Sequence, residues 1–494
     1  MKTTLLRLAL LAVCALVLFP SGVQSSDGVL KVGSAAVDIS PTEFPVAVDG
    51  YFELRYFDKV RDPLFARAIV IENGDQRFVI ATIDTMLANA DFISQIKQKV
   101  SDKSGFPADR ISISSTHTHF APQNVTPGSG SIQARHSQKV IEGTANAILQ
   151  AIENVQPAKF GWGTCREPRH VFCRRYIMKP GTVWDEPLEF VGVERNIAQM
   201  NPPRGSANII SRTGVPDQTI YVAAFQTLDG KPLALLANYS THYAGGEETL
   251  SSDYFGIFAK RIAEKLDAPK NFVAMMTNGT SGDTNCIDAL NPKQEPFDRD
   301  LVGERVAEDV FNVLKDIKEY KTDAPVLAAA KTINLKYRKP TSEEIQFAKD
   351  YLVEADKYLA AKKEGKKVDN TEAVTVTKDR FKTTTISYAR RTLRQVSLPE
   401  SVDVLLQTFA VGNFGICTIP NEVFSFTGHD LRANSPFQPT IVISLANGYN
   451  GYLPTYDQFE LGGYTTWRGT SFLERMAEPT IRAQLLDMLR QIAP

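Results

Sequence analysis

The sequence has almost no net charge and few of the residue types that build metal or disulfide frameworks. Its 494 residues include six histidines, five cysteines and three tryptophans, and the formal net charge at pH 7 is −1. A chain this close to neutrality lacks the excess of basic residues that nucleic-acid binding requires, so we expect no nucleic-acid partner. Apolar residues at 43% and charged residues at 22% are instead typical of an ordinary globular protein.

Long apolar runs are also missing after the first 26 residues, so we expect no membrane-spanning segment in the mature chain. The N-terminus differs, because Lys2 and Arg7 precede an apolar run at residues 8–19, and residues 23–25 offer a cleavage site. This order predicts a signal peptide over residues 1–26 and export to the periplasm or the extracellular space. The run is shorter than the roughly 20 residues of a membrane span, so a retained anchor is the less favoured alternative.

Four cysteines remain beyond the signal, of which Cys165 and Cys173 are close in sequence. Their spacing matches no zinc-knuckle pattern. An oxidising compartment permits a disulfide between them, but a chain of this length does not need one. Because the sequence cannot fix the Cβ geometry that a disulfide requires, the pairing of Cys165 with Cys173 is left open.

Strand-like and helix-like segments alternate along the chain, without an internal repeat. Residues 67–72 and 77–83 flank the turn Asn73-Gly-Asp75 and predict a β-hairpin. Residues 220–225 and 232–239 predict a second hairpin around Leu228-Asp-Gly230. Further strands are expected at 110–115, 272–276, 404–419 and 440–445, and helices at 92–100, 137–153 and 254–266. The alternation predicts an α/β core, with α+β as the alternative, and leaves the strand order open.

The stretch of residues 341–394 differs in character from the rest of the chain. It is rich in lysine and glutamate, and its apolar residues recur at helical spacing from Ile345 to Leu359. We interpret it as a charged helical insertion on the surface, with a structural rather than a functional role.

Two of the six histidines stand two residues apart in Ser115-Thr-His-Thr-His119, at the end of the strand expected at residues 110–115. If that strand continues, His117 and His119 point to the same face as its apolar residues, because side chains alternate along a strand. Two imidazoles on the inward face of a strand end are suited to a metal site. Core histidines with satisfied hydrogen bonds, or a surface loop, are the alternatives.

Two further candidate ligands also follow strand-like runs. His242 comes after the run of residues 233–241, and Glu422 follows Pro420 behind the run of residues 404–419. Two histidines, a carboxylate and one more oxygen would bind zinc and leave room for water. Each residue also has an ordinary explanation, His242 as a structural histidine and Glu422 as a residue at the start of the next helix, where the helix dipole favours a carboxylate.

A loop rich in glycine and tyrosine, Asn447-Gly-Tyr-Asn-Gly-Tyr452, completes the pattern, since such loops bring phenol oxygens and backbone amides close to a ligand. With it, the chain resembles the neutral/alkaline ceramidase family, in the form common to many bacterial ceramidase-like hydrolases. The resemblance covers roughly residues 30–480 and rests on the order of its landmarks, which are Gly50-Tyr51, Asp62-Pro-Leu-Phe-Ala-Arg67, Thr116-His-Thr-His119, Arg174-Arg175, His242, Gly282-Asp283, Pro420-Asn-Glu422 and the tyrosine loop.

The resemblance implies one large catalytic domain over residues 27–494, with central mixed β-sheets flanked by helices, and one catalytic Zn²⁺. The residues that match the family's zinc ligands are His117, His242, Glu422 and Tyr452. His119 matches a histidine that assists at the reaction centre without binding the metal. Arg174 matches a catalytic-site arginine, although Cys173 stands where the family has an asparagine, which keeps Arg175 as an alternative.

One position departs from the family pattern. The family's ceramidases carry a functional serine in a Gly-Asp-Val-Ser-Pro-Asn type of loop, whereas this loop reads Ser281-Gly-Asp-Thr-Asn-Cys286 and has Asn285 at the serine position. An asparagine cannot form a useful acyl-enzyme, but its amide can donate a hydrogen bond to a developing oxyanion. We also expect the chain to lack the family's immunoglobulin-like C-terminal domain. Both departures bear on the substrate rather than on the fold or the metal.

The residues and the resemblance together predict a secreted zinc-dependent amidohydrolase that acts on a ceramide-like N-acyl-sphingosine lipid. In this prediction zinc activates water for attack on the amide carbonyl. His119 moves the proton, Arg174 neutralises the oxyanion and Asn285 positions the substrate.

A lipid substrate would bring the protein into peripheral contact with a membrane surface, and the oligomeric state is left open. One alternative is a zinc hydrolase of another amide or ester, on a sugar or a peptide-like metabolite. The other is a non-catalytic secreted binding protein that holds zinc as a structural ion, in a closed site without water.

Overall fold

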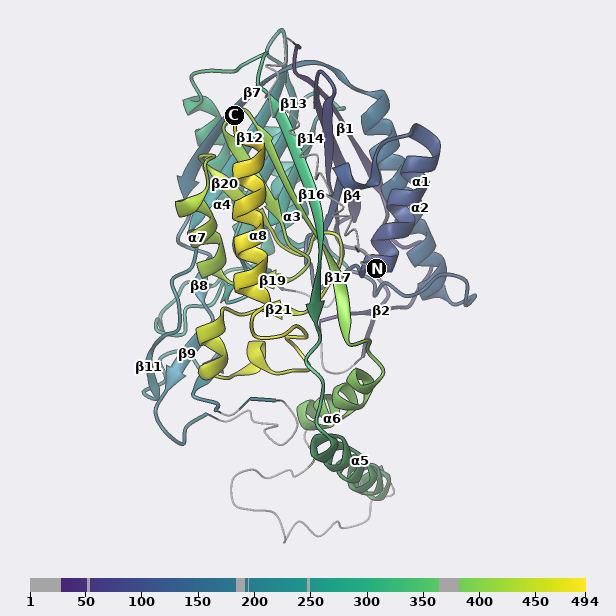
Figure 1. Ribbon diagram of the computed structural model, residues 1–494, viewed down its shortest axis with the longest axis vertical. Helices are drawn as coiled ribbons and strands as arrows, with labels where there is room; N and C mark the ends of the chain where they lie inside the picture. Colours follow the sequence, from purple (N-terminus) through teal and green to yellow (C-terminus); the bar gives the residue numbers. More distant parts are fainter. Residues whose placement is uncertain are drawn as a thin grey trace, which may run out of the picture.

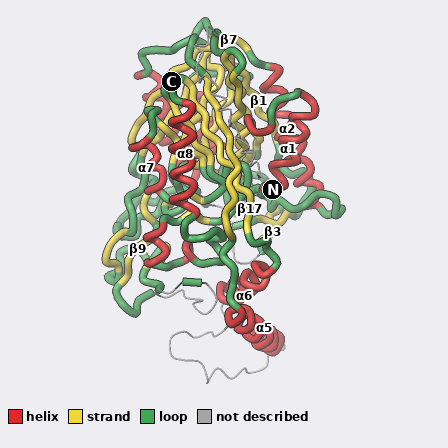
Figure 2. Tube along the Cα trace, in the orientation of Figure 1, coloured by secondary structure: helices red, strands yellow, loops and turns green. Residues whose placement is uncertain are grey.

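Strands lie at the centre of the protein and helices on the outside, as the ribbon in Figure 1 and the tube in Figure 2 show. The computed structural model describes residues 28–50, 54–183, 192–193, 195–246, 249–363, 381 and 383–494. The signal peptide predicted for residues 1–26 lies outside this part. Among the described helices, none combines the length and the apolar character needed to span a membrane.

The larger of two central sheets has eight strands. In spatial order they are β14 (Val273–Asn278), β13 (Pro232–Tyr239), β12 (Thr219–Thr227), β7 (Gln156–Arg166), β1 (Lys31–Asp38), β4 (Phe65–Asn73), β5 (Gln76–Ile83) and β6 (Ile111–Ser115). Neighbours are antiparallel except at the two edges, where β13 pairs with β14 and β5 pairs with β6 in parallel. Because β1 and β7 pair only at Lys31–Pro157 and Val32–Gln156, the sheet consists of two halves that join in the middle.

Each half of this sheet repeats one arrangement, a hairpin followed by a helix and a parallel edge strand. β4 and β5 form the first hairpin, and α1 (Ala90–Ser104) leads from it toward β6. β12 and β13 form the second, and α3 (Asp253–Lys265) leads from it to β14. Gly74 in the first turn has φ +59°, a conformation that glycine adopts without strain. Both hairpins predicted from the sequence are confirmed.

A smaller sheet of four strands packs against the larger one. Its order is β16 (Val326–Lys336), β17 (Ser401–Val411), β18 (Phe414–Thr418) and β20 (Thr440–Ile443). Phe78 of β5 and Phe409 of β17 stack between the sheets with ring centroids 4.5 Å apart, and both side chains are fully buried. One continuous apolar cluster with residues from both sheets surrounds this pair.

Helices cover the outer faces of both sheets. α1 and α2 (Ile132–Glu153) pack on the half that contains β4 to β6, and α3 and α4 (Arg299–Asp316) pack on the half that contains β12 to β14. α7 (Ser425–Asn434) and α8 (Ala477–Ile492) cover the four-stranded sheet. The α/β class with central mixed sheets and flanking helices, predicted above, is confirmed.

Short elements gather around the ends of the two large sheets. Three are strand pairs: β2 (Val46–Val48) with β3 (Arg55–Phe57), β8 (Phe172–Cys173) with β15 (Thr284–Asn285), and β19 (Glu422–Val423) with β21 (Tyr452–Leu453). A three-stranded sheet consists of β10 (Ala198–Met200), β9 (Arg175–Met178) and β11 (Ile209–Arg212). The 3-10 turns are Ala108–Arg110, Tyr456–Glu460 and Tyr464–Thr466. In the stretch of residues 341–394, α5 (Ser342–Lys363) and α6 (Thr383–Val396) lie at one end of the molecule (Figure 1).

The four cysteines beyond the signal are free thiols. Cys173 is buried and its Sγ lies 3.1 Å from the carbonyl oxygen of Arg175, to which the thiol donates a hydrogen bond. Cys165 stands on β7, opposite Ile220 of β12. The disulfide that the sequence left open between Cys165 and Cys173 is therefore not formed.

We expect the contact between the two sheets to dominate the stability of the fold. Replacing Phe409 by alanine removes a buried ring and leaves a cavity, which should lower the free energy of unfolding by about 3–5 kcal/mol. The matched control is Phe426→Ala on α7, where the side chain is 55% exposed and the expected loss is below about 0.5 kcal/mol. Urea denaturation followed by circular dichroism measures both variants, and equal losses would contradict the expectation.

Candidate metal centre

Three parts of the chain that are far apart in sequence end beside one another. His117 follows β6, His242 follows β13, and Glu422 opens β19 after β18. A short backbone segment, residues 444–447, follows β20 and joins these ends; we call it the bridge segment. Its position is the reason that residues from both sheets meet at one site.

The bridge segment is hydrogen-bonded to both edges of the larger sheet. The backbone amide of Ser444 donates to the carbonyl oxygen of Asn278 at the end of β14, at 3.0 Å. The amide of Asn447 donates to the carbonyl oxygen of Ile113 in β6, at 2.8 Å. The edge strands β6 and β14 are thereby held together through the main chain of a third segment.

The strand predicted at residues 110–115 does not continue to His119. β6 ends at Ser115, and His117 has φ +72°, a left-handed conformation that is uncommon for residues other than glycine. The amide of His117 donates to the carbonyl oxygen of Thr85 at 3.0 Å, which fixes this turn. The predicted strand is confirmed, and a backbone turn rather than a continuation of this strand brings His117 and His119 to the same place.

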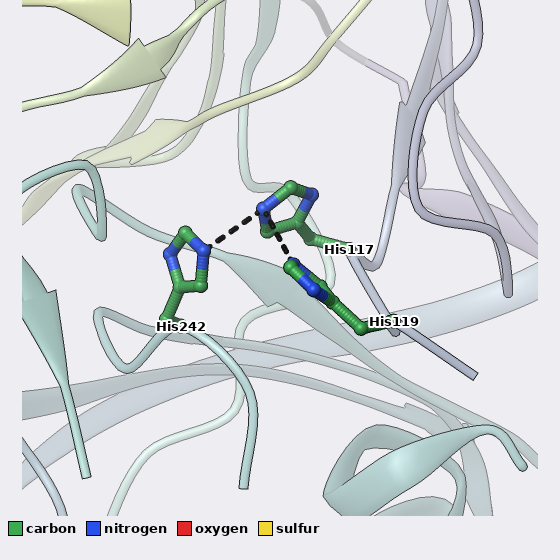
Figure 3. A group of neighbouring side chains, drawn as sticks. All are labelled: His117, His119 and His242. Carbon is green, nitrogen blue, oxygen red and sulfur yellow. Dashed lines mark hydrogen bonds between the residues drawn. The ribbon is translucent and has the colours of Figure 1, made fainter. Parts of the chain in front are cut away.

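Three buried histidines converge at this point. His117 Nε2 lies 3.1 Å from His242 Nε2 and 3.4 Å from His119 Nε2, and Figure 3 shows the rings turned toward one another. One ring nitrogen from each histidine lies within 4.8 Å of the other two. The group could hold a metal ion.

Backbone carbonyls fix the protonation of two of these rings. His117 Nδ1 lies 2.9 Å from Met86 O, and His242 Nδ1 lies 3.1 Å from Ser281 O. A carbonyl oxygen only accepts, so each Nδ1 carries a proton and each Nε2 faces the other ring. Burial, and then the charges of Arg174 and His117, lowers the pKa of His242 well below its usual value, which favours the neutral form. In the neutral rings that bind a metal, the two Nε2 lone pairs 3.1 Å apart would repel each other without a cation between them.

Glu422 brings a carboxylate to the same space. Its Oε2 lies 3.5 Å from His117 Nε2 and 3.8 Å from His242 Nε2, and no hydrogen-bond donor reaches it from the described residues. Burial opposes ionisation, but the neighbouring His117 and Arg174 lower the pKa of Glu422 below its usual value. The other oxygen, Oε1, accepts a hydrogen bond from the Tyr449 hydroxyl at 3.0 Å. Glu422 therefore presents an ionised oxygen to the histidines.

The backbone at Glu422 is fixed by the bridge segment and by a close glycine. The amide of Leu445 donates to the carbonyl oxygen of Asn421 at 3.1 Å. A Cβ atom on Gly282 would come within 2.5 Å of the Glu422 carbonyl oxygen, so only glycine permits this approach. The alternative of Glu422 as a helix-capping residue is not borne out, because the N-cap of α7 is Phe424.

These atoms have the spacing of ligands around one first-row cation. Tetrahedral coordination at 2.0–2.1 Å places neighbouring ligand atoms about 3.3 Å apart. The distances that join His117 to His242, His119 and Glu422, and His242 to Glu422, run from 3.1 to 3.8 Å. Neutral imidazoles with a carboxylate are also a donor set that zinc accepts, and the carbonyls behind Nδ1 orient the rings as outer-shell groups do in metal sites.

His119 is held rigidly beside this group. Its ring stacks on Tyr243 with centroids 4.0 Å apart and an interplanar angle of 20°. On the other side, a Cβ atom on Gly50 would come within 2.4 Å of His119 Nδ1. Burial, and then the charges of His117 and Arg174, lowers the pKa of His119 well below its usual value. The ring is therefore a neutral base, close enough to His117 Nε2 to share its ligand or to act on a group bound there.

Arg174 lies at the site and Arg175 does not. Nη2 of Arg174 donates to the Tyr452 hydroxyl at 2.6 Å and lies 3.9 Å from Glu422 Oε2. The guanidinium of Arg175 points to a different part of the fold, where it donates to the Thr465 hydroxyl. The sequence left the choice between the two arginines open, and the geometry places Arg174 beside the metal ligands.

Tyr452 reaches the site from β21, where it stands opposite Glu422 in a parallel pairing. Burial raises the pKa of Tyr452 well above its usual value, against the lowering effect of Arg174. Tyr449, the other tyrosine of the same loop, was not among the predicted site residues, yet it donates to Glu422. The repeated Gly-Tyr pattern of residues 447–452 is the sequence feature that could have identified both tyrosines as site residues.

Asn285, predicted to act on the substrate, is not brought to this group. Its amide nitrogen donates to the side-chain oxygen of Asn201 at 2.6 Å, and its own oxygen accepts from the amide of Ile287 at 2.9 Å. Nor does Asn285 line the cavity described next. One hydrogen of the Asn285 amide is thus bonded within the fold, and its role in positioning the substrate stays a prediction.

A cavity of about 500 Å³ is lined by His117, His119 and Glu422, among other residues. Its apolar wall consists of Met86, Leu87, Leu398 and Phe472, with tyrosines between them. The C-terminal half of α6 supplies another wall, through Arg391, Arg394 and Gln395. α6 belongs to the stretch of residues 341–394, for which we predicted a structural role, and its C-terminal half lines the cavity of the candidate site.

Comparison with known proteins identifies the fold. A ceramidase complexed with C2 superposes with a TM-score of 0.66 at 14% sequence identity, over 94% of this chain and 75% of that chain. The neutral ceramidase from Pseudomonas aeruginosa gives a TM-score of 0.65 at 14% identity, over 94% and 74% of the two chains. The chain has the ceramidase fold. No protein-family model matches the sequence, so the likeness is one of structure.

Removing one of the converging imidazoles should remove the metal. We expect the purified protein to bind about one divalent ion per chain. His242→Ala should bind less than about one tenth of that, because the variant lacks one of the imidazole ligands. His136→Ala is the matched control, since His136 is also buried but lies on α2, outside the group. Elemental analysis by mass spectrometry provides the count, and equal metal content in the two variants would refute the assignment.

Proposed function

We propose that this protein is an exported zinc-dependent hydrolase that cleaves the amide bond of a ceramide-like N-acyl lipid. The observation that carries the proposal is the convergence of His117, His242 and Glu422, whose facing atoms lie within 3.8 Å of one another, beside a cavity that His117 and Glu422 line. The ceramidase fold of the solved relatives supports the same chemistry. Export rests on the charged, apolar and small-residue order of residues 1–26.

In this proposal, each residue around the ligands has a separate role in the reaction. A zinc ion bound by His117, His242 and Glu422, with Tyr452 as a fourth ligand, would polarise the amide carbonyl and acidify a water molecule. His119, a neutral base within 3.4 Å of His117 Nε2, takes up a proton and returns it to the leaving amine. Arg174 stays cationic and neutralises negative charge that develops on the carbonyl oxygen.

The lining of the cavity supports a substrate with an acyl chain. Met86, Leu87, Leu398 and Phe472 give one wall an apolar surface, which would accept hydrocarbon and exclude water from the reacting bond. The volume of about 500 Å³ falls within the usual range of small-molecule sites. A sugar substrate would instead require polar groups around the whole cavity.

The activity is tested with a fluorescent N-acyl-sphingosine and purified protein. We expect release of the fluorescent acid, loss of release after treatment with a chelator, and recovery when zinc is added back. His117→Ala should lower turnover by at least about 100-fold, because it removes a ligand, and His136→Ala should not. Full metal binding without release from this substrate would move the assignment to another amide or ester.

The two neighbouring arginines should separate catalysis from folding. Arg174→Met should lower kcat per bound metal ion by about 100-fold, since it removes the cation beside the reacting carbonyl. Arg175→Met should leave kcat per bound ion within about threefold and should lower the free energy of unfolding by about 1–3 kcal/mol, because buried partners such as Thr465 lose their donor. Steady-state kinetics and urea denaturation of both variants provide the measurements, and the reverse pattern would contradict the placement of Arg174.

A further inference from the structure

We infer that α6 recognises an anionic group on the substrate, through Arg391 and Arg394, and so selects N-acyl amides whose other half carries a carboxylate or a phosphate. The inference rests on the proposed amide hydrolysis and adds the chemical class of the substrate. It starts from two cationic side chains on one wall of the cavity that contains the metal ligands.

The two arginines stand three residues apart on α6 and therefore lie on the same helix face. Both line the cavity, whereas Arg390, one residue earlier, points outward and lies 3.9 Å from Asp356 of α5. Burial, and then the positive charge of Arg391 and Arg390, lowers the pKa of Arg394, so like charges act on one another along this wall. An anion bound between Arg391 and Arg394 would relieve that repulsion.

Arg391 is already oriented for such a contact. Its Nη1 donates to the carbonyl oxygen of Gly469 at 3.1 Å, and its guanidinium carbon lies 5.0 Å from the centre of the Tyr388 ring. Tyr388 is itself buried and its hydroxyl is hydrogen-bonded to that of Thr470. A guanidinium held in place loses little conformational entropy when it binds a carboxylate or a phosphate, for which its planar donor set is suited.

Arg394 is the more accessible member of the pair. Arg394 is exposed and yet lines the cavity, which places its side chain at the cavity rim. In the described part of the chain no carboxylate lies within ion-pair distance of its guanidinium, in contrast to Arg390. Arg394 can thus attract an anion from solution and deliver it toward Arg391.

The acidic residues of the cavity do not neutralise this wall. Among the described lining residues the carboxylates are Asp49 and Glu422. Glu422 faces the histidines, as described above. Asp49 accepts a hydrogen bond from Gln123 at 2.8 Å, and burial raises its pKa to about 6. The described lining therefore combines two arginines of α6 with the candidate metal ligands His117 and Glu422.

The test measures binding, so that it does not depend on turnover. Isothermal titration compares N-octanoyl-glycine with N-octanoyl-glycinamide, which have the same length and differ in one negative charge. We expect the metal-loaded protein to bind the anionic member about tenfold more tightly, and we expect salt raised from about 50 mM to about 500 mM to reduce the difference. Octyl phosphate against octanol then distinguishes a phosphate from a carboxylate preference.

Variants on α6 assign the preference to its residues. Arg394→Gln should reduce the tenfold preference to less than about threefold without changing the affinity for the neutral amide, and Arg394→Lys should restore part of it. Arg390→Gln is the matched control and should behave as the unchanged protein does. The titrations are repeated on chelated protein, because a carboxylate bound by the metal itself would lose its preference there.

The outcomes separate this inference from the proposed function. Equal affinities for the charged and neutral ligands, or an unchanged preference in Arg394→Gln, would overturn the role of α6 even if ceramide-like lipids are cleaved. A preference that disappears only on chelation would also overturn it. Conversely, absence of chelator-sensitive release from any acyl amide would overturn the proposed hydrolysis and leave a charge preference measured by titration standing.

Discussion

A concentration of acceptor atoms in a buried space is the constraint on which the candidate site depends. His117 Nε2, His242 Nε2 and Glu422 Oε2 face one another, and no described donor reaches the carboxylate oxygen. Removing such groups from water is unfavourable by several kcal/mol unless positive charge compensates. Arg174 lies 3.9 Å from the carboxylate but already donates to Tyr452, so it supplies only part of that charge. A bound cation would supply the rest.

Acceptor atoms that repel each other stay close together only where a more rigid part of the structure than packed side chains holds them. Here the main chain does this, because the bridge segment of residues 444–447 is hydrogen-bonded to β6, to β14 and to the residue before Glu422. Carbonyl oxygens of Met86 and Ser281 then fix the rotation of two imidazole rings. Backbone links of this kind place few demands on side-chain identity, which agrees with a shared fold at 14% sequence identity.

The sequence predicted what is local and missed what depends on distant contacts. The hairpins around Asn73-Gly-Asp75 and Leu228-Asp-Gly230 were predictable because turn residues and alternation lie within one short window. Each of His117, His242 and Glu422 was also marked by its place after a strand. The left-handed turn at His117, the order of the strands and the position of Asn285 were not, since they are set by hydrogen bonds to segments far away in sequence.

The same limit applies to α6, whose position beside the cavity could not be predicted from the sequence. Lysine- and glutamate-rich composition indicates an exposed helix, but it does not reveal which neighbour the helix faces, and the cavity wall with Arg391 and Arg394 exists only in the folded chain. The metal ligands come from the ends of the central sheets, whereas this wall comes from an inserted helix pair. Reaction type and substrate choice are thus carried by different parts of the molecule. The fold shared with ceramidases at 14% sequence identity fixes neither, so both depend on residues of this chain such as His117 and Arg394.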